Sequence, residues 1–418
     1  MKKALVILFA IMVLFGTVSC ERSEAPTLVV WSFTDEIYNM ITQYFMRDFP
    51  GVNIEYSMTE QAMFESRLDP VLASGIGVPD IIAMEASFVR KYIESGFLLD
   101  LTDIWEAYRD RILPYTVEVG MYNGRVYGLS WQATPGAFFF RRSLALRYLG
   151  TDDPEIVQTY FQDIDAFLAT AQLLRERSNG TCVVVSSRGD IFHVMFAARE
   201  NPWIVDGQLT IDPMMFRYME ISRFMHDQRL EGRVGQWSEG WFAGMRDELR
   251  DEAGNSISVF GYFLPTWGLH YILKPNTPET AGDWAMIQGP VPYRWGGTWL
   301  GAYRNTRHPE AARQLIRYLT VDNLFLEEYA RNTGDFVSNM MVVERIKHDF
   351  YNPFLGGQNH YAEFARMAIN ICGRLLQGTD RVIEDYWHEA VTAFVEDEKT
   401  MAQALADFRD QVNSVLGL

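Results

Sequence analysis

The sequence contains few cysteines and less basic than acidic charge. Three cysteines occur in 418 residues, which excludes the class of small disulfide-rich secreted domains. Cys182 and Cys372 either form one disulfide or remain two buried free thiols. Lys and Arg total 37 against 54 Asp and Glu, which gives a net charge of -17. This charge argues against nucleic acid as a partner, because its phosphates require a basic surface. For the same reason we do not expect an anionic ligand by default.

Motifs of the common enzyme classes are also missing. Trp387-His388-Glu389 contains one histidine where a zinc-protease helix requires two, and no G-x-S-x-G turn is present. Gly75 and Gly77 follow a predicted helix rather than a strand, so they do not form a nucleotide-binding loop. The seven histidines are scattered, and the cysteines lack metal-ligand spacing. The sequence thus predicts no catalytic residue, no cofactor and no metal site.

Beyond its first residues the chain has no long apolar segment, no internal repeat and no low-complexity linker. A length of 418 residues exceeds what one hydrophobic core organises, which predicts two lobes. A hydrophobic content of 48% excludes extensive disorder. Because no linker separates the two lobes, we expect the chain to cross between them several times.

The first twenty residues resemble a bacterial lipoprotein signal. Two lysines precede an apolar run over residues 4–16, which is short for a membrane span, and a small residue precedes Cys20. The resemblance implies a signal peptide over residues 1–19, a lipid on Cys20 and a polar tether over residues 20–26. The protein is then exported and anchored to a bacterial membrane by its lipid. An ordinary secretory signal is the alternative.

Strand and helix patterns alternate along the first hundred residues. Apolar, β-branched runs predict strands, and apolar residues at helical spacing predict the helices between them. A βαβαβ order predicts a parallel sheet with helices on both faces. The predicted strands cover residues 27–33, 52–58 and 79–84, and the predicted helices cover residues 35–49, 60–75 and 87–96.

Polar side chains follow each of these predicted strands. Thr34 and Glu36 follow the first strand, Glu60 follows the second and Glu85 follows the third. Ligands of open α/β sheets bind at the carboxyl ends of the strands, so these four residues are candidate ligand-binding residues. The alternative for Thr34 and Glu36 is that they cap the helix that begins there.

Tryptophan is frequent, with eleven in the chain, and two of them flank a glycine pair in Trp295-Gly296-Gly297-Thr298-Trp299. A flat indole covers the apolar face of a sugar ring, while carboxylates and amides bind its hydroxyls. Glycine leaves the backbone open to close approach by a ligand. The stretch therefore predicts part of a surface for a flat, hydroxylated ligand. The alternative is core packing, which we expect for Trp299.

The order of several motifs resembles one protein family. Seven stretches carry the resemblance, at residues 28–57, 72–102, 123–150, 237–248, 260–271, 284–320 and 331–346. Together with the lipoprotein signal they resemble the extracellular solute-binding proteins of ABC importers, in the carbohydrate-binding family that includes maltose-binding proteins. The resemblance covers nearly the whole chain after the signal.

This resemblance implies a two-lobed α/β fold, like that of periplasmic binding proteins, with multiple hinge crossings and a ligand cleft between the lobes. It implies that lobe one holds residues 27–133 and 297–332, and that lobe two holds residues 134–296 and 333–418. The implied function is capture of a sugar or oligosaccharide by cleft closure and its delivery to the permease subunits of an ABC importer. The implied partners are a carbohydrate, that permease and the membrane through the lipid, and the chain is expected to be a monomer.

The resemblance also adds candidate ligand-binding residues. Trp267 matches the position of a ligand-stacking aromatic in the family. The glycine pair lies where the chain re-enters lobe one, and one of Trp237 and Trp241 is expected to reach the cleft. The remaining candidates at the crossings and the cleft are Trp131, Gln132, Trp295, Gly296, Gly297 and Asp335.

Three other functions stay open at this point. The first is a surface-anchored carbohydrate-active enzyme, and the second is a solute-binding protein that serves signalling. The third is a binding protein for a cationic or peptide ligand, because an acidic, aromatic cleft also suits cations. The kind of sugar, its length and its linkage are not encoded in any motif that we can read.

Overall fold

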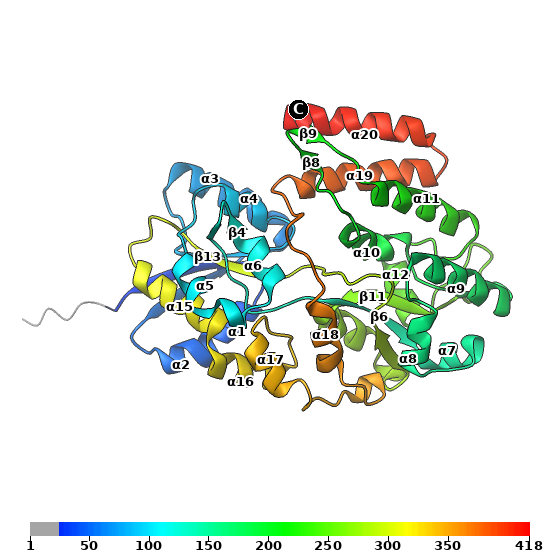
Figure 1. The fold of residues 1–418 in the computed structure, drawn as a ribbon, viewed down its shortest axis with the longest axis horizontal. Helices are drawn as coiled ribbons and strands as arrows, with labels where there is room; N and C mark the ends of the chain where they lie inside the picture. Colours follow the sequence, from blue (N-terminus) through cyan, green and yellow to red (C-terminus); the bar gives the residue numbers. More distant parts are fainter. Residues whose placement is uncertain (1–24) are drawn as a thin grey trace, which may run out of the picture.

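The computed structural model describes residues 25–418, which form two lobes around two separate β-sheets (Figure 1). The first sheet has the strand order β13-β3-β1-β2 and the second has the order β11-β6-β12. This arrangement confirms the two-lobed α/β fold expected from the sequence. The expected signal peptide, Cys20 and most of the expected tether lie outside the described residues.

The first sheet is mostly parallel, as its alternating pattern predicts. Strand β1 pairs in parallel with β2 and β3, and β13 runs antiparallel to β3. The register places Thr298 opposite Glu85, so the glycine pair before β13 lies at the carboxyl end of β3. The strands are β1 (Thr27–Ser32), β2 (Asn53–Met58), β3 (Ile81–Glu85) and β13 (Thr298–Ala302).

The helices predicted between these strands are present. The first is continuous through a π-helical segment at Ile41–Phe45, and the second ends at Gly75, whose φ of 69° is a left-handed conformation that glycine adopts without strain. The helices of this region are α1 (Glu36–Met40), α2 (Met46–Asp48), α3 (Gln61–Ser74), α4 (Val89–Glu94), α5 (Thr102–Tyr108) and α6 (Pro114–Gly120).

The second sheet is antiparallel and has β6 at its centre. Every residue of β6 is buried, because neighbouring strands flank it and other elements cover both faces. The rings of Phe138 and Phe263 lie 4.6 Å apart at their centroids, which anchors this core. The strands are β6 (Gly136–Arg141), β11 (Gly261–Pro265) and β12 (Trp284–Ile287).

Three segments that cross between the lobes are hydrogen-bonded to one another. The Ala133 N–H donates to the Phe336 carbonyl at 2.8 Å, and the Trp295 N–H donates to the Thr134 carbonyl at 3.2 Å. Further along, the Leu300 N–H donates to the Leu129 carbonyl at 2.8 Å. The lobes are thus joined by paired backbone segments rather than by a flexible linker.

Helices surround both sheets. In Figure 1, α15, α16 and α17 lie with the first sheet, α7 to α12 lie with the second, and the C-terminal pair α19 and α20 lies beside α11. Helix α17 packs against α16. The bounds are α7 (Arg142–Leu149), α8 (Pro154–Thr159), α9 (Ile164–Arg177), α10 (Phe192–Ala197), α11 (Pro213–Asp227), α12 (Glu239–Met245), α13 (Thr266–Gly268), α14 (Lys274–Asn276), α15 (Pro309–Val321), α16 (Asn323–Thr333), α17 (Met340–Ile346), α18 (His360–Ala368), α19 (Asp380–Val395) and α20 (Met401–Leu416).

Short strand pairs complete the fold. They are β4 (Met121–Tyr122) with β5 (Arg125–Val126), β7 (Cys182–Val183) with β10 (Ser258–Val259), and β8 (Ile204–Val205) with β9 (Gln208–Leu209). The β4–β5 hairpin precedes the extended segment that leads through β6 into α7.

The two cysteines among the described residues are free thiols. Cys182 is buried in β7, whereas Cys372 is exposed, so neither the disulfide nor the pair of buried thiols expected from the sequence is correct. Burial raises the pKa of the Cys182 thiol to about 12, which makes it unreactive at neutral pH. Across residues 25–418 no helix combines the length and the apolar character needed to cross a membrane.

Candidate ligand-binding site

Two neighbouring cavities lie between the lobes. The larger has a volume of about 300 Å³ and the smaller about 260 Å³. Gln61, Glu85 and Gly296 line both, so the cavities meet at these residues. Gln61 follows β2 and Glu85 ends β3, so the meeting point is the carboxyl edge of the parallel strands, where ligands bind in open α/β sheets.

The smaller cavity combines aromatic rings with carboxyl, hydroxyl and amide groups. Seven residues that the sequence singles out line it, namely Thr34, Glu36, Glu85, Gln132, Trp267, Gly296 and Gly297. The other lining residues are Phe33, Gln61, Tyr271, Ile272 and Thr298. This mixture suits a ring with apolar faces and a hydroxylated rim.

A buried pair of carboxyl groups supports the wall of the smaller cavity. The Tyr329 hydroxyl donates a hydrogen bond to Glu36, and the Asp335 carboxyl lies against the same side chain. Burial raises the pKa of Glu36, and burial together with the neighbouring Glu36 charge raises the pKa of Asp335 well above its usual value. Two buried charges of the same sign repel strongly, so this pair of neighbouring carboxyl groups disfavours the state in which both are ionised.

Three tryptophans gather beside the cavities. The rings of Trp237 and Trp267 stack with centroids 6.3 Å apart and planes 12° apart. Trp295 meets Trp267 edge-on at 5.5 Å, and its own ring stacks on His193 at 4.5 Å. Trp267 lines the smaller cavity and Trp295 lines the larger one. One face of Trp295 is thus covered by His193, so its exposed ring surface is less than a free indole offers.

The glycine pair is required by the packing of these indoles. Gly296 has a φ of 70°, and a Cβ there would lie 2.9 Å from Nε1 of Trp267. Gly297 has a φ of 115°, and a Cβ there would lie 3.0 Å from the ring of Trp299. The sequence analysis explained these glycines by the close approach of a ligand. In the structure, the atoms closest to an added Cβ belong to Trp267 and Trp299 of the protein itself.

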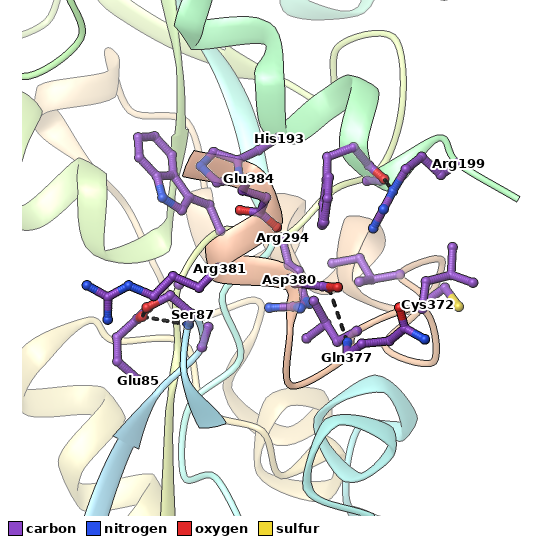
Figure 2. Close-up of a pocket in the computed structure, with 18 of the residues that line it drawn as sticks. Glu85, Ser87, His193, Arg199, Arg294, Cys372, Gln377, Asp380, Arg381 and Glu384 are labelled. Atoms are coloured by element: carbon purple, nitrogen blue, oxygen red, sulfur yellow. Dashed lines mark hydrogen bonds between the residues drawn. The ribbon is translucent and has the colours of Figure 1, made fainter. Parts of the chain in front are cut away.

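The larger cavity carries most of the ionisable groups (Figure 2). Arg294 precedes Trp295, Arg199 follows α10, and Asp380 and Glu384 come from the first turns of α19. Its remaining labelled residues are Glu85, Ser87, His193, Cys372, Gln377 and Arg381. The Ser87 N–H donates to the Glu85 carboxylate at 2.7 Å, which orients that carboxylate at the junction of the cavities.

Burial shifts the pKa values of these groups. The pKa of Asp380 rises to about 7 and that of Glu384 to about 8, chiefly because desolvation disfavours their charged forms. Burial also lowers the pKa of His193 to about 3, so this imidazole is neutral at physiological pH and stacks on Trp295 as an uncharged ring. Among the described residues there is no group of three His, Cys, Asp or Glu side chains arranged to hold a metal ion.

The sequence from the first strand to the short strand β8 matches a family model. The model describes the bacterial extracellular solute-binding proteins and matches residues 31–203. This part of the chain is similar in sequence to the bacterial extracellular solute-binding proteins. A search of curated proteins finds no match to the sequence.

Solved structures of solute-binding proteins share the fold over nearly the whole chain. A structure described as extracellular solute-binding protein family 1 has a TM-score of 0.82 at 19% identity, covering 94% of this chain and 100% of that one. The ABC transporter associated binding protein from B. animalis subsp. lactis, in complex with β-1,6-galactobiose, has a TM-score of 0.71 at 18% identity, covering 94% and 98%. The sugar-binding protein MalE from Xanthomonas citri has a TM-score of 0.75 at 14% identity, covering 94% and 97%.

Several residues expected at the site lie elsewhere in this solute-binding fold. Trp131 is fully buried in the core, and Trp241 is fully buried with its indole N–H bonded to Asp190 at 2.8 Å. Glu60 is exposed at the start of α3 and lines neither cavity, whereas its neighbour Gln61 lines both. Asp335 lies behind Glu36 rather than in the lining.

Three other residues lie where the sequence predicts them. Trp237 is 44% exposed and stacks on Trp267, so of the pair with Trp241 it is the one on the accessible side. Trp299 is buried, and its indole N–H donates to the Thr116 carbonyl at 2.7 Å, which confirms its core role. Thr34 Oγ1 accepts a hydrogen bond from the Glu36 N–H at 3.3 Å, so Thr34 both shapes the helix start and faces the cavity. Contact of these residues with a ligand stays a prediction.

Apart from Glu85, the ionisable residues of the larger cavity were not predicted from the sequence. His193 and Arg199 come from α10 and its end, and Asp380 and Glu384 come from α19. On a helical pattern such residues look like an ordinary solvated face. Arg294 had one available signal, since it directly precedes the Trp-Gly-Gly stretch.

Proposed function

We propose that this protein captures a sugar or an oligosaccharide for an ABC importer. The ligand binds in the two joined cavities between the lobes, the lobes close on it, and the closed form delivers it to the permease. Catalysis is not part of this function, because the site is built to hold a ligand rather than to transform one.

The observation that carries the proposal is the composition of the smaller cavity. Trp267 offers an indole surface, while Glu36, Glu85 and Gln132 offer oxygen and nitrogen atoms for hydroxyl groups. These groups come from both lobes and converge on one space, which is the arrangement that closure around a ligand requires. Two of the similar structures carry a sugar or a sugar-binding description in their titles, which supports the same ligand class.

The lobe boundaries expected from the sequence remain part of this proposal. Lobe one then holds residues 27–133 and 297–332, and lobe two holds residues 134–296 and 333–418. The packing of α17 against α16 favours moving residues 340–346 into lobe one. The paired backbone segments near Ala133, Trp295 and Phe336 then act as the hinge.

The location that we propose follows from the lipoprotein signal. Cys20 carries a lipid, and the protein lies on the outer side of a bacterial membrane, next to its permease. It works as a monomer and without a cofactor.

A melting-temperature screen over neutral mono- and oligosaccharides tests the function. A sugar present at about 100 times its Kd stabilises the folded protein by about 2.7 kcal/mol, which raises the melting temperature clearly. The sugar recovered afterwards is expected to be intact, whereas a cleaved product identifies a carbohydrate-active enzyme instead. Stabilisation by spermidine or a short peptide, with no effect of any sugar, contradicts the proposal.

A further inference from the structure

Two arginines in the larger cavity, Arg294 and Arg199, have no counter-ion in contact within residues 25–418. Arg294 lines this cavity together with Glu85, Asp380 and Glu384. Burial lowers the pKa of Arg294, and the charges of Tyr115 and of these three carboxyl groups oppose that shift. No ion pair or hydrogen bond joins its guanidinium to another residue in the described part of the chain. A partly buried charge without a contacting counter-ion is costly, so this side chain is available to bind an anionic group that enters the cavity.

Arg199 is in the same position. It is 5% exposed, its Nε donates to the Phe196 carbonyl at 3.0 Å, and its guanidinium carbon lies 3.4 Å from the centre of the Phe196 ring. Its Nη1 is buried and has no hydrogen-bond partner within residues 25–418. Burial is the main cause that lowers the pKa of Arg199; the charges of Asp380 and Glu384 oppose this shift, and the charge of Arg294 adds a smaller lowering.

Within residues 25–418 the nearby carboxyl groups form no ion pair with these two arginines, although their charges stabilise both guanidinium groups from a distance. Asp380 is 4% exposed, and its Oδ1 is buried and without a partner in the described residues. Its Oδ2 accepts a hydrogen bond from the Gln377 N–H at 3.2 Å. Since burial raises the pKa of Asp380 to about 7 and that of Glu384 to about 8, both groups are protonated in a large share of molecules. The third cavity arginine, Arg381, is already ion-paired with Glu65.

The cavity therefore presents two unpaired guanidinium groups beside carboxyl oxygens that are free to bind hydroxyls. A guanidinium fork binds a carboxylate through two parallel hydrogen bonds, and it does so best where water is excluded. A sugar hydroxyl can donate to the free Oδ1 of Asp380. We infer that the larger cavity takes a sugar acid, with its ring carboxylate on Arg294 and Arg199 and its hydroxyls toward Asp380 and Glu384.

This inference rests on the proposed function and narrows it to sugars that bear a carboxylate. It runs against the expectation from the net charge of -17, which made an anionic ligand an unlikely default. Exposed charges beyond a Debye length of about 8 Å are screened by salt, so the groups inside the cavity decide the local preference. The neighbouring smaller cavity gives room for a second, neutral ring.

Calorimetric titration of the wild-type protein tests the inference with matched ligands. The probes are digalacturonate and its carboxyl-reduced form, which differ only in the carboxylates, together with glucuronate, glucose and glucose 6-phosphate. We expect the acid to bind about 10- to 100-fold more tightly than its reduced form, from charge-assisted hydrogen bonds. Raising the salt concentration is expected to weaken binding of the acid and to leave the reduced form nearly unaffected.

The R294Q variant locates the effect. We expect its affinity for digalacturonate to fall about 10- to 100-fold, so that the difference between acid and reduced form disappears. Its ligand-free melting temperature is expected to stay unchanged or to rise slightly, because a partly buried charge without a contacting counter-ion is removed. An arginine with only a structural role would instead lower the melting temperature when replaced. R223Q is the matched control, since Arg223 is ion-paired with Asp227 and Asp397 away from both cavities.

The outcomes separate the inference from the function. Equal affinity for the acid and the reduced form, or a preference for glucose 6-phosphate over glucuronate, overturns the sugar-acid assignment and leaves sugar binding intact. A melting temperature and heat signal unchanged by every sugar, acidic or neutral, overturns both. If R294Q does not fold, the wild-type comparison of matched ligands still decides the inference.

Discussion

The indole N–H of Trp267 donates a hydrogen bond of 3.0 Å to the backbone carbonyl of Trp295. Trp267 lines the smaller cavity and Trp295 lines the larger one, so this bond ties the walls of the two cavities together. The carbonyl belongs to the segment that crosses between the lobes. A ligand that contacts and displaces the Trp267 ring would therefore also displace the crossing segment at Trp295. Ligand binding and the relative position of the lobes are coupled through this hydrogen bond.

Replacing Trp267 by alanine is expected to weaken sugar binding far more than it weakens the fold. Loss of a well-packed stacking ring typically reduces affinity by a few kcal/mol, which is roughly tenfold to a thousandfold. Trp299→Ala is the contrasting variant, since its buried ring leaves a core cavity that lowers the free energy of unfolding by about 3–5 kcal/mol. Titration calorimetry and melting of both ligand-free variants give the comparison. Similar stability losses with unchanged affinity would mean that Trp267 only packs.

Gly296→Ala is expected to disturb the indole pair. The new Cβ meets Nε1 of Trp267 at 2.9 Å, and the left-handed φ of 70° adds backbone strain. We expect a loss of about 1–3 kcal/mol in the free energy of unfolding and a clear loss of affinity. Gly124→Ala is the matched control, because its φ is 75° and a Cβ there has no heavy atom within 4 Å. Equal effects of the two substitutions in both measurements would contradict the proposed contact.

The stability of the ligand-free protein is expected to decrease as pH rises from about 5 to about 8. Asp380 and Glu384 have pKa values of about 7 and about 8 in the folded state, above their usual 3.8 and 4.5. The folded state therefore binds protons more tightly than the unfolded state, and this contribution is lost as pH rises through the folded pKa values. Chemical denaturation at several pH values measures the trend.

Glu384→Gln tests whether this carboxyl group contributes. Since glutamine does not ionise, the variant is expected to be more stable than the wild type at pH 8 by about 1–3 kcal/mol, with a smaller difference at pH 5. Glu279→Gln, at an exposed position, serves as the control. A pH dependence identical in wild type and Glu384→Gln would exclude Glu384 as its source.

Ligand is expected to bring the lobes together as rigid bodies. The crossing segments are hydrogen-bonded to one another, and an ion pair between Glu65 of α3 and Arg381 of α19 spans the lobes beside the larger cavity. Small-angle scattering of the saturated protein should therefore give a smaller radius of gyration than the ligand-free protein. Arg381→Gln is expected to weaken binding only a few-fold, because a partly exposed ion pair contributes little. Superimposable scattering curves with and without a verified ligand would count against closure.

Cys20→Ser is expected to release the protein from the membrane fraction without unfolding it. The lipid attaches to the Cys20 thiol, and a serine hydroxyl does not accept it. Fractionation followed by melting of the released protein checks both parts of the prediction. A variant that stays in the membrane fraction until detergent is added would contradict the lipoprotein assignment.

Local patterns in the sequence were sufficient for most of the fold. The alternation of strands and helices over residues 27–96, and the stop of α3 at Gly75, depend on side chains close to one another along the chain. The same local reasoning placed Thr34 and Glu85 at the carboxyl ends of strands, and both line the smaller cavity. Periodicity and capping are properties of short segments, so one sequence suffices to read them.

The tertiary structure alone decided which groups meet and which are covered. Trp131 and Trp241 looked like cleft residues, but neighbouring elements bury them completely, while Trp237 stays accessible. Arg294 and Asp380 line one cavity although 86 residues (380 minus 294) separate them in the chain. Burial and counter-ion supply depend on packing between distant segments, so neither the unpaired charge of Arg294 nor the raised pKa of Asp380 is encoded in any local motif.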